Sequence, residues 1–134
     1  MRIVIIDREP AFLGPVADEL EREGFEVAVV ENIPNALAFI KTKSVQFLVA
    51  DSSVLVDHSL GGEVLRQYPL TRLIVLAAHP SILGMIESIS RGITDYLPRA
   101  EESFGELVDT ILDERNRLER WQHALLSPLF AKNG

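Results

Sequence analysis

The chain has 134 residues, 47% of them hydrophobic, which predicts one domain with one core and leaves no room for a separate output domain. It contains no cysteine, which excludes disulfides and thiolate metal sites and favours a reducing compartment such as the cytoplasm. Its 13 Lys and Arg residues against 20 Asp and Glu residues give a formal charge of −7, the wrong sign for binding nucleic acid.

Short apolar runs, too short for a signal peptide or a membrane span, mark the predicted strands. Residues 3–6, 47–50 and 73–78 are almost continuously apolar, which is typical of parallel strands buried on both faces of a sheet. Residues 25–30 include a glutamate and predict a more exposed strand, and residues 94–97 predict a short fifth one.

Segments with helical spacing separate these runs. The first has its apolar stripe at Leu13, Val16, Ala17 and Leu20, and Gly24 should follow its last turn. The others are predicted around residues 36–40 (entered through Asn32 and Pro34), 64–65, 82–89 and 104–112. Five strands alternating with five helices predict a doubly wound α/β domain, because parallel neighbours need helical crossovers. Such a domain carries its site at the carboxyl ends of the strands.

Polar residues follow the predicted strands at that edge. Asp7-Arg8-Glu9 follows the first strand, Asp51 ends the third, and Asp95-Tyr96-Leu97 comes after Gly92. Together they resemble the receiver domain of response regulators in two-component signalling, over residues 1–117. The resemblance implies a flavodoxin-like fold, a five-stranded parallel sheet of strand order 2-1-3-4-5 with helices on both faces. Residues 118–134 then form a C-terminal helical extension and tail.

The resemblance also implies roles for individual residues. Asp51 is at the position of the aspartate that accepts a phosphoryl group, and Asp7, Asp51 and the carbonyl of Ser53 are at the positions that hold Mg²⁺. A hard cation with oxygen ligands is needed there because a carboxylate that attacks a phosphate meets like charge. Tyr96 is at the position of an aromatic switch. Without the resemblance, Asp51 could be a turn cap and Tyr96 a packing residue.

Several positions depart from the family pattern. Arg8 stands where a second acidic residue is usual, Ala77 where a Thr or Ser is usual, and Arg99 where a Lys is usual. A guanidinium about 4 Å from a carboxylate is worth roughly 4 kcal/mol at an effective dielectric near 20, and it repels Mg²⁺ on a comparable scale. We therefore expect Arg8 to occupy the place of the metal, and we expect no cofactor. Glu9 argues the other way, since its longer side chain could supply a missing oxygen ligand.

The sequence leaves three functions open. The first is a signalling module, not an enzyme, that docks a histidine kinase or a downstream effector through the fourth helix, the fifth strand and the fifth helix. The second is a conventional receiver switched by phosphorylation of Asp51. The third is an aspartyl-nucleophile phosphatase, which would need a second Asp where this chain has Ser53. Neither nucleic acid nor a membrane is expected as a partner.

The apolar stripe of the fifth helix continues past residue 112. Leu118, Trp121 and Leu125 follow at spacings of three and four, which predicts a longer helix that ends near Ser127-Pro128. This stripe has to be buried, either by folding back on the domain or by pairing two copies through the helix and its extension. We expect the homodimer.

Overall fold

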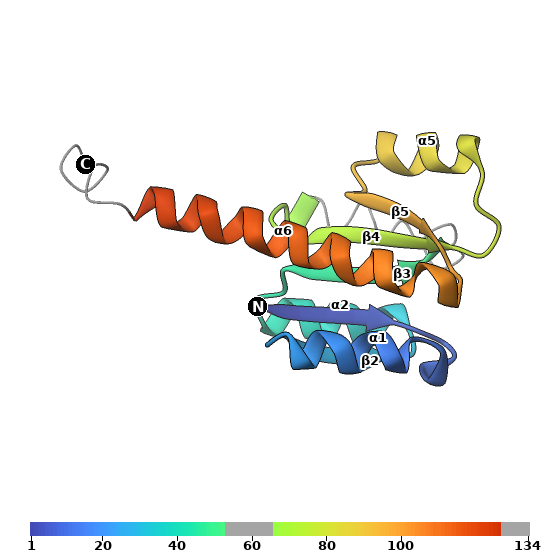
Figure 1. The fold of residues 1–134 in the computed structure, drawn as a ribbon, viewed down its shortest axis with the longest axis horizontal. Coiled ribbons are helices and arrows are strands. Elements are labelled where there is room, and N and C mark those ends of the chain that lie inside the picture. The colour runs from blue at the N-terminus through green and yellow to red at the C-terminus, as the bar shows by residue number, and fades with distance from the viewer. Residues whose placement is uncertain (53–65, 127–134) are drawn as a thin grey trace.

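The computed structural model describes residues 1–52 and 66–126. Five parallel strands form one sheet of order β2-β1-β3-β4-β5 (Figure 1). The strands are β1 (Arg2–Ile6), β2 (Glu26–Val30), β3 (Phe47–Asp51), β4 (Arg72–Ala77) and β5 (Asp95–Pro98). The predicted strand order is confirmed, and each predicted strand ends within one residue of the observed bounds.

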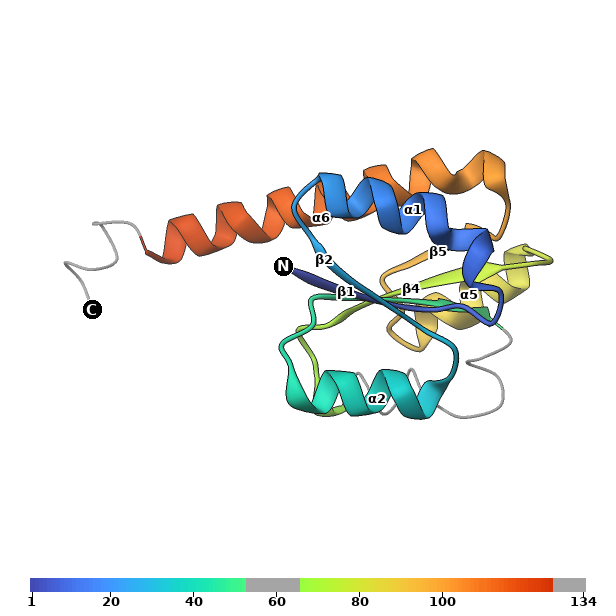
Figure 2. The same ribbon diagram turned by 90° about the horizontal axis from the view of Figure 1, so that it is seen from below.

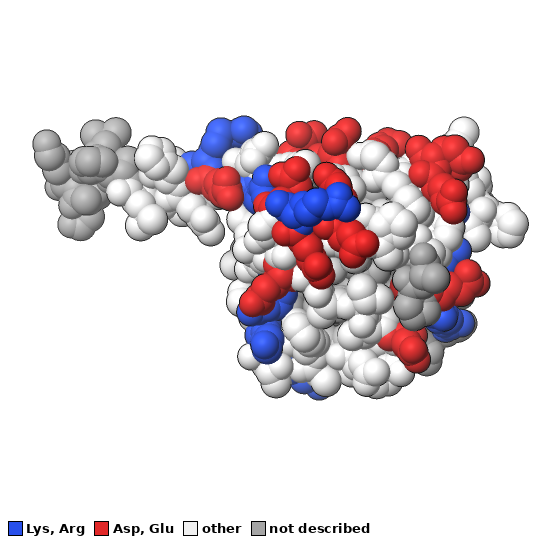
Figure 3. Space-filling model, turned by 60° about the horizontal axis from the view of Figure 1, so that its bottom comes forward, with Lys and Arg blue, Asp and Glu red and all other residues white. Residues whose placement is uncertain are grey.

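Helices cover both faces of this sheet (Figure 2). On one face lie α1 (Pro10–Arg22) and α6 (Phe104–Leu125), and on the other lie α2 (Ile33–Thr42) and α5 (Ile82–Ser90). A short 3₁₀ turn, η1 (Glu101–Ser103), precedes α6. Acidic side chains gather on the outer surface of the layer that α1 and α6 form (Figure 3). The helix predicted around residues 64–65 lies outside the described residues.

The strands pack their side chains alternately on the two faces. In β1, Ile3 and Ile5 belong to the core beneath α1 and α6, and Val4 and Ile6 belong to the core beneath α2. All four are buried. This double burial explains why the central strands are continuously apolar in the sequence.

Local signals fix two of the helix ends. Gly24 follows the C-cap of α1 with φ +95°, a left-handed conformation that glycine adopts without steric cost. Asn32 caps α2, because its side-chain oxygen accepts a hydrogen bond of 2.9 Å from the Asn35 N–H. Both residues behave as the sequence predicted.

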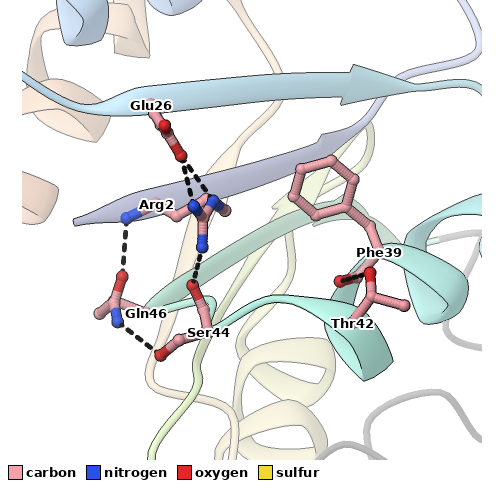
Figure 4. Close-up of polar contacts among 6 residues, drawn as sticks. All are labelled: Arg2, Glu26, Phe39, Thr42, Ser44 and Gln46. Carbon is pink, nitrogen blue, oxygen red and sulfur yellow. Dashed lines mark hydrogen bonds and ion pairs between the residues drawn. The ribbon is translucent and has the colours of Figure 1, made fainter.

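Polar contacts close the amino-terminal edge of the sheet (Figure 4). The guanidinium of Arg2 pairs with Glu26 of β2 at 2.6 Å and donates to the Ser44 carbonyl at 2.8 Å, and the Arg2 N–H donates to the Gln46 side chain. These groups tie β1 to β2 and to the segment before β3. Because these polar groups bind one another, we assign this edge of the sheet a role in stability.

The helix α6 is longer than the sheet that it covers, and its C-terminal part projects past the other elements (Figure 1). Arg115 anchors it by donating to the Glu23 carbonyl at 2.6 Å, and Glu114 pairs with Arg72 and with Arg117. No described helix has both the length and the apolar character needed to cross a membrane.

Candidate functional site

Four residues from different strands meet at the carboxyl edge of the sheet. Asp7 follows β1, Asp51 ends β3, Ala77 ends β4 and Arg99 follows β5. The backbone N–H of Arg99 donates to the Ala77 carbonyl at 2.8 Å, which continues the pairing of β4 with β5 to this point. The fold thus brings together residues that the sequence singled out separately.

Asp7 is buried and is bound by the start of α1. One carboxylate oxygen accepts a hydrogen bond of 2.9 Å from the Glu9 N–H, and the other accepts one of 3.2 Å from the Leu13 N–H. Both N–H groups lie at the start of a helix, where a negative charge is favoured. Asp7 is therefore held in place by the start of α1.

The guanidinium of Arg99 contacts the carboxylates of this pocket. Its Nε lies 3.1 Å from Oδ2 of Asp51, and its Nη2 lies 3.4 Å from Oδ1 of Asp7. The same Nη2 is 4.0 Å from the exposed carboxylate of Glu9. A planar guanidinium offers several donors at once, so that one side chain can bridge carboxylates that come from different strands.

An aromatic ring lies beneath this guanidinium. The central carbon of Arg99 is 4.1 Å from the centre of the Phe12 ring, a cation–π geometry. Phe12 in turn meets Phe104, the first residue of α6, edge to face at 5.2 Å between ring centres. Sequence reasoning missed Phe12 and Phe104, because no spacing indicates which residue of α1 or α6 lies beside a residue after β5.

Arg8 does not take the position that we expected. The cation that contacts Asp7 and Asp51 is Arg99, whereas the Arg8 side chain is exposed and takes part in none of the ion pairs among residues 1–52 and 66–126. Asp7 is buried against the start of α1, whereas Arg8 lies in the bend that leads into this helix and is exposed. Arg8 is consequently directed outward.

The carboxylates at the positions expected to hold Mg²⁺ have other partners in this structure. Both oxygens of Asp7 accept hydrogen bonds from α1, and a guanidinium lies against Asp7 and Asp51. Within the described parts of the chain, no group of three or more His, Cys, Asp or Glu residues could hold a metal ion. Ser53, the expected carbonyl ligand, lies outside them.

Tyr96 is half-buried between the core and the start of α5. Its hydroxyl oxygen accepts a hydrogen bond of 3.3 Å from the Ser81 N–H, and Ser81 is the N-cap of α5. A methyl group in place of the Gly84 hydrogen would lie 3.0 Å from the Tyr96 hydroxyl, so that glycine allows this close approach. The residue expected to be a switch therefore contacts a helix end.

Ala77 is buried at the end of β4 and carries no hydroxyl group. The phosphatase hypothesis needs a second catalytic Asp at position 53, where this chain has Ser. Ser53 lies outside the described residues.

No protein-family model matches the chain, but individual proteins do. It is 23% identical to the photosynthetic apparatus regulatory protein RegA of Rhodobacter capsulatus over 135 residues, covering 90% of this chain and 73% of RegA. It is 27% identical to the acid tolerance regulatory protein ActR of Rhizobium meliloti over 134 residues, covering 90% of this chain and 69% of ActR.

Solved structures share the fold at lower identity. An orphan response regulator of H. pylori, HP1043, superimposes with a TM-score of 0.77 at 17% identity over 84% of this chain and 94% of that one. A CheY-like receiver domain of Methanospirillum hungatei superimposes with a TM-score of 0.76 at 22% identity, over 89% of this chain and 96% of that one. An atypical orphan response regulator, described as having a phosphorylation-independent regulatory mechanism, superimposes with a TM-score of 0.74 at 16% identity, over 81% of this chain and 90% of that one. With this sheet order and these likenesses, the chain has the CheY-like receiver fold, and its sequence is similar to those of regulatory proteins such as RegA and ActR.

Proposed function

We propose that this receiver domain transmits its signal in the cytoplasm by docking protein partners, and that Mg²⁺-dependent phosphorylation of Asp51 is impaired or absent. In this proposal the chain is not an enzyme and uses no cofactor. The partner is a histidine kinase or a downstream effector, as the resemblance implies. A conventional receiver switched at Asp51 is the alternative.

The observation that carries the proposal is the position of Arg99. Its guanidinium lies against both carboxylates that would have to bind the metal, at 3.1 Å from Asp51 and 3.4 Å from Asp7. Asp7 and Arg99 are both largely shielded from water, so their attraction is screened less than that of a surface pair. A metal ion would have to displace this cation and would be repelled by it until it did.

Ala77 supports the same proposal. A phosphoryl group on Asp51 would add oxygens that need hydrogen-bond donors, and the methyl group of Ala77 cannot donate. The similarity to an atypical regulator described as phosphorylation-independent is consistent with this view, although at 16% identity the likeness concerns the fold.

The phosphatase hypothesis has less support. A second carboxylate would have to act as acid and base beside Asp51, and the described acidic neighbours, Asp7 and Glu9, both contact Arg99. The Asp7 carboxylate also accepts hydrogen bonds from two N–H groups at the start of α1.

The proposal is tested with a small acyl phosphate donor and Mg²⁺, followed by an assay for acid-stable, base-labile phosphate on the protein. We expect no more phosphate on the natural chain than on Asp51→Asn. A variant with Arg8→Asp, Ala77→Thr and Arg99→Lys restores the usual residue types of the family and should gain phosphate at Asp51. Stoichiometric phosphorylation of the natural chain would contradict the proposal.

The docking surface that we propose comprises α5, β5 and α6. The large apolar side chains of α5 are exposed, led by Ile82 and Leu83, and the described residues bury none of that helix. Exposed apolar surface on one element marks an interaction site. This surface also includes Tyr96, whose hydroxyl lies at the start of α5.

We also propose a second copy of the chain as a partner of the C-terminal part of α6. Trp121 is 54% exposed and Leu125 is 67% exposed, whereas Leu118, one turn earlier, packs against the core. Leu118 lies seven residues after the buried Ile111, and Trp121 and Leu125 follow at spacings of three and four, as in a two-helix seam. A pair of such helices would cover the apolar stripe where it leaves the domain.

A further inference from the structure

The strand β2 forms one edge of the sheet, and its outer side has no neighbouring strand among the described residues. Its bonds to β1 show which of its backbone groups face outward. The Glu26 N–H donates to the carbonyl just before β1 at 3.0 Å, and the Val30 carbonyl accepts from the N–H just after β1 at 2.9 Å. Because the backbone groups of successive residues in a strand point to opposite sides, Val27 and Val29 direct theirs away from the sheet.

This edge is open to solvent and lacks the usual protection of an exposed strand. Val29 is 40% exposed, and the rest of residues 27–30 is partly exposed although it packs against the core. Edge strands that avoid pairing carry Lys or Pro, or are very short. The opposite edge follows this rule, since β5 has four residues and ends at Pro98. Residues 27–30 have none of these features, and they are therefore suited to accept another strand.

Two carboxylates stand at the ends of this apolar run. Glu26 pairs with Arg2 of β1 at 2.6 Å (Figure 4), so that its charge is balanced within the sheet. Glu31 is exposed and takes part in none of the ion pairs among residues 1–52 and 66–126. A ligand that lies along the edge would therefore meet one unbalanced negative charge, at the end of β2 that leads to α2.

We propose that the free edge of β2 binds an extended segment of a partner protein as an added strand. The main chain of this segment would bond to the N–H and C=O groups of Val27 and Val29, and its β-branched side chains would cover Val29. A Lys or Arg would face Glu31. We take the segment as antiparallel to β2, because antiparallel pairs are slightly more stable per residue. Its basic residue then lies N-terminal to its apolar residues.

The inference goes beyond the proposed function. The edge of β2 belongs neither to the surface of α5, β5 and α6 nor to the projecting end of α6, and it lies at the far side of the sheet from β5. Binding there does not depend on whether Asp51 is phosphorylated.

Hydrogen exchange of the β2 amides identifies binding at this edge. The probe is a synthetic peptide with blocked ends, Lys-Lys-Val-Thr-Val-Thr-Val, added to the full chain without Mg²⁺ or phosphodonor. In the chain alone, the Val27 and Val29 amides should exchange quickly and the Ala28 and Val30 amides slowly, because only the second pair faces β1. Peptide that fills about nine-tenths of the sites should slow the exchange of Val27 and Val29 about tenfold.

Val29→Pro tests the main-chain bonds. It removes the outward N–H of β2 and leaves the bonds to β1 in place, as proline does on an edge strand. We expect at least about a tenfold loss of affinity for the peptide. Val29→Thr keeps the N–H and the branched shape, and as the matched control it should bind within about twofold of the natural chain. Slow exchange of the Ala28 and Val30 amides in both variants shows that the sheet is intact.

A second pair of variants tests the charge and leaves the strand unchanged. Glu31→Lys should weaken binding several-fold, whereas Glu87→Lys, which changes the net charge equally on α5, should have little effect. A peptide with Glu in place of Lys should bind several-fold more weakly than the basic one.

The proposal would be overturned by equal affinities of the two Val29 variants, by unchanged exchange of the Val27 and Val29 amides, by equal binding of the acidic peptide, or by no binding at all. It would also be overturned if Val29→Pro changed the sedimentation of the chain alone, because the edge would then pair two copies. Phosphorylation of Asp51 in the separate acyl phosphate assay would contradict the proposed function and leave these results unaffected.

Discussion

Arg99 lies with its guanidinium carbon 4.1 Å from the centre of the Phe12 ring, so that α1 supports the cation that contacts Asp51. A lysine ammonium is a compact point charge, whereas the flat guanidinium can stack on a ring while its edge donates to carboxylates. The change from the family's usual Lys to Arg99 therefore alters geometry as well as size. It lets one side chain touch Asp7, Asp51 and Phe12 together.

Replacing Asp7 with Ala should destabilise the domain by about 1–2 kcal/mol, because two N–H groups at the start of α1 lose their acceptor. Urea unfolding measures this change. Asp18→Ala, an exposed substitution later in α1, is the control and should change the free energy of unfolding by less than about 0.5 kcal/mol. Equal effects of the two substitutions would show that Asp7 does not stabilise the helix start.

The fold could be predicted from the sequence because its determinants are local or repetitive. Continuous apolar runs such as residues 47–50 indicate strands buried on both faces, and Gly24 and Asn32 mark helix ends through their own backbone and side-chain chemistry. The length of α6 followed in the same way from the regular spacing of its apolar residues.

The pocket could be predicted only in part. Its residues follow the strands, so Asp7, Asp51, Ala77 and Arg99 could be identified one by one. Which cation contacts the carboxylates depends on side-chain directions. Arg8 adjoins Asp7 in sequence, but its side chain is exposed. Arg99 follows the edge strand β5, and its side chain reaches both aspartates. The support from Phe12 depends on how α1 packs, which no local pattern encodes.

Mg²⁺ should bind weakly or not at all, because Arg99 already lies against the two aspartates. Titration of Mg²⁺ with observation of the amide signals of Asp7 and Asp51 measures this. The double variant Arg8→Asp with Arg99→Lys adds a carboxylate and shortens the cation, and it should bind Mg²⁺ more tightly. Saturation of the natural chain at low millimolar Mg²⁺ would be inconsistent with the proposed pocket.

A negative charge that mimics phosphate at Asp51 should have little effect on Tyr96. Asp51→Glu extends the carboxylate, but Ala77 offers no hydroxyl that could follow it, so the hydrogen bond from the Ser81 N–H to Tyr96 should persist. The amide shift of Ser81 and the ring signals of Tyr96 report this. Adding Ala77→Thr should increase the response. Concerted shifts of Tyr96 and α5 in Asp51→Glu alone would refute the prediction.

Removing the end of α6 should abolish self-association. The full chain should sediment as a concentration-dependent monomer–dimer mixture in the micromolar range, and a chain ending at Arg117 should be a monomer, because it lacks the exposed Trp121 and Leu125. Trp121→Arg in the full chain is the matched point variant and should also be a monomer. A full chain that stays monomeric across this range would rule out the homodimer.

The central claim, that the guanidinium of Arg99 occupies the pocket of Asp51, is tested most directly by the NMR signal of the Arg99 Nε–H group. Arg99→Lys assigns this signal by its loss. We predict a resolved, slowly exchanging signal that shifts in Asp51→Asn, because Nε lies 3.1 Å from the Asp51 carboxylate, and that does not move on addition of millimolar Mg²⁺. A fast-exchanging signal at the position of free arginine, or one displaced by Mg²⁺, would contradict the claim.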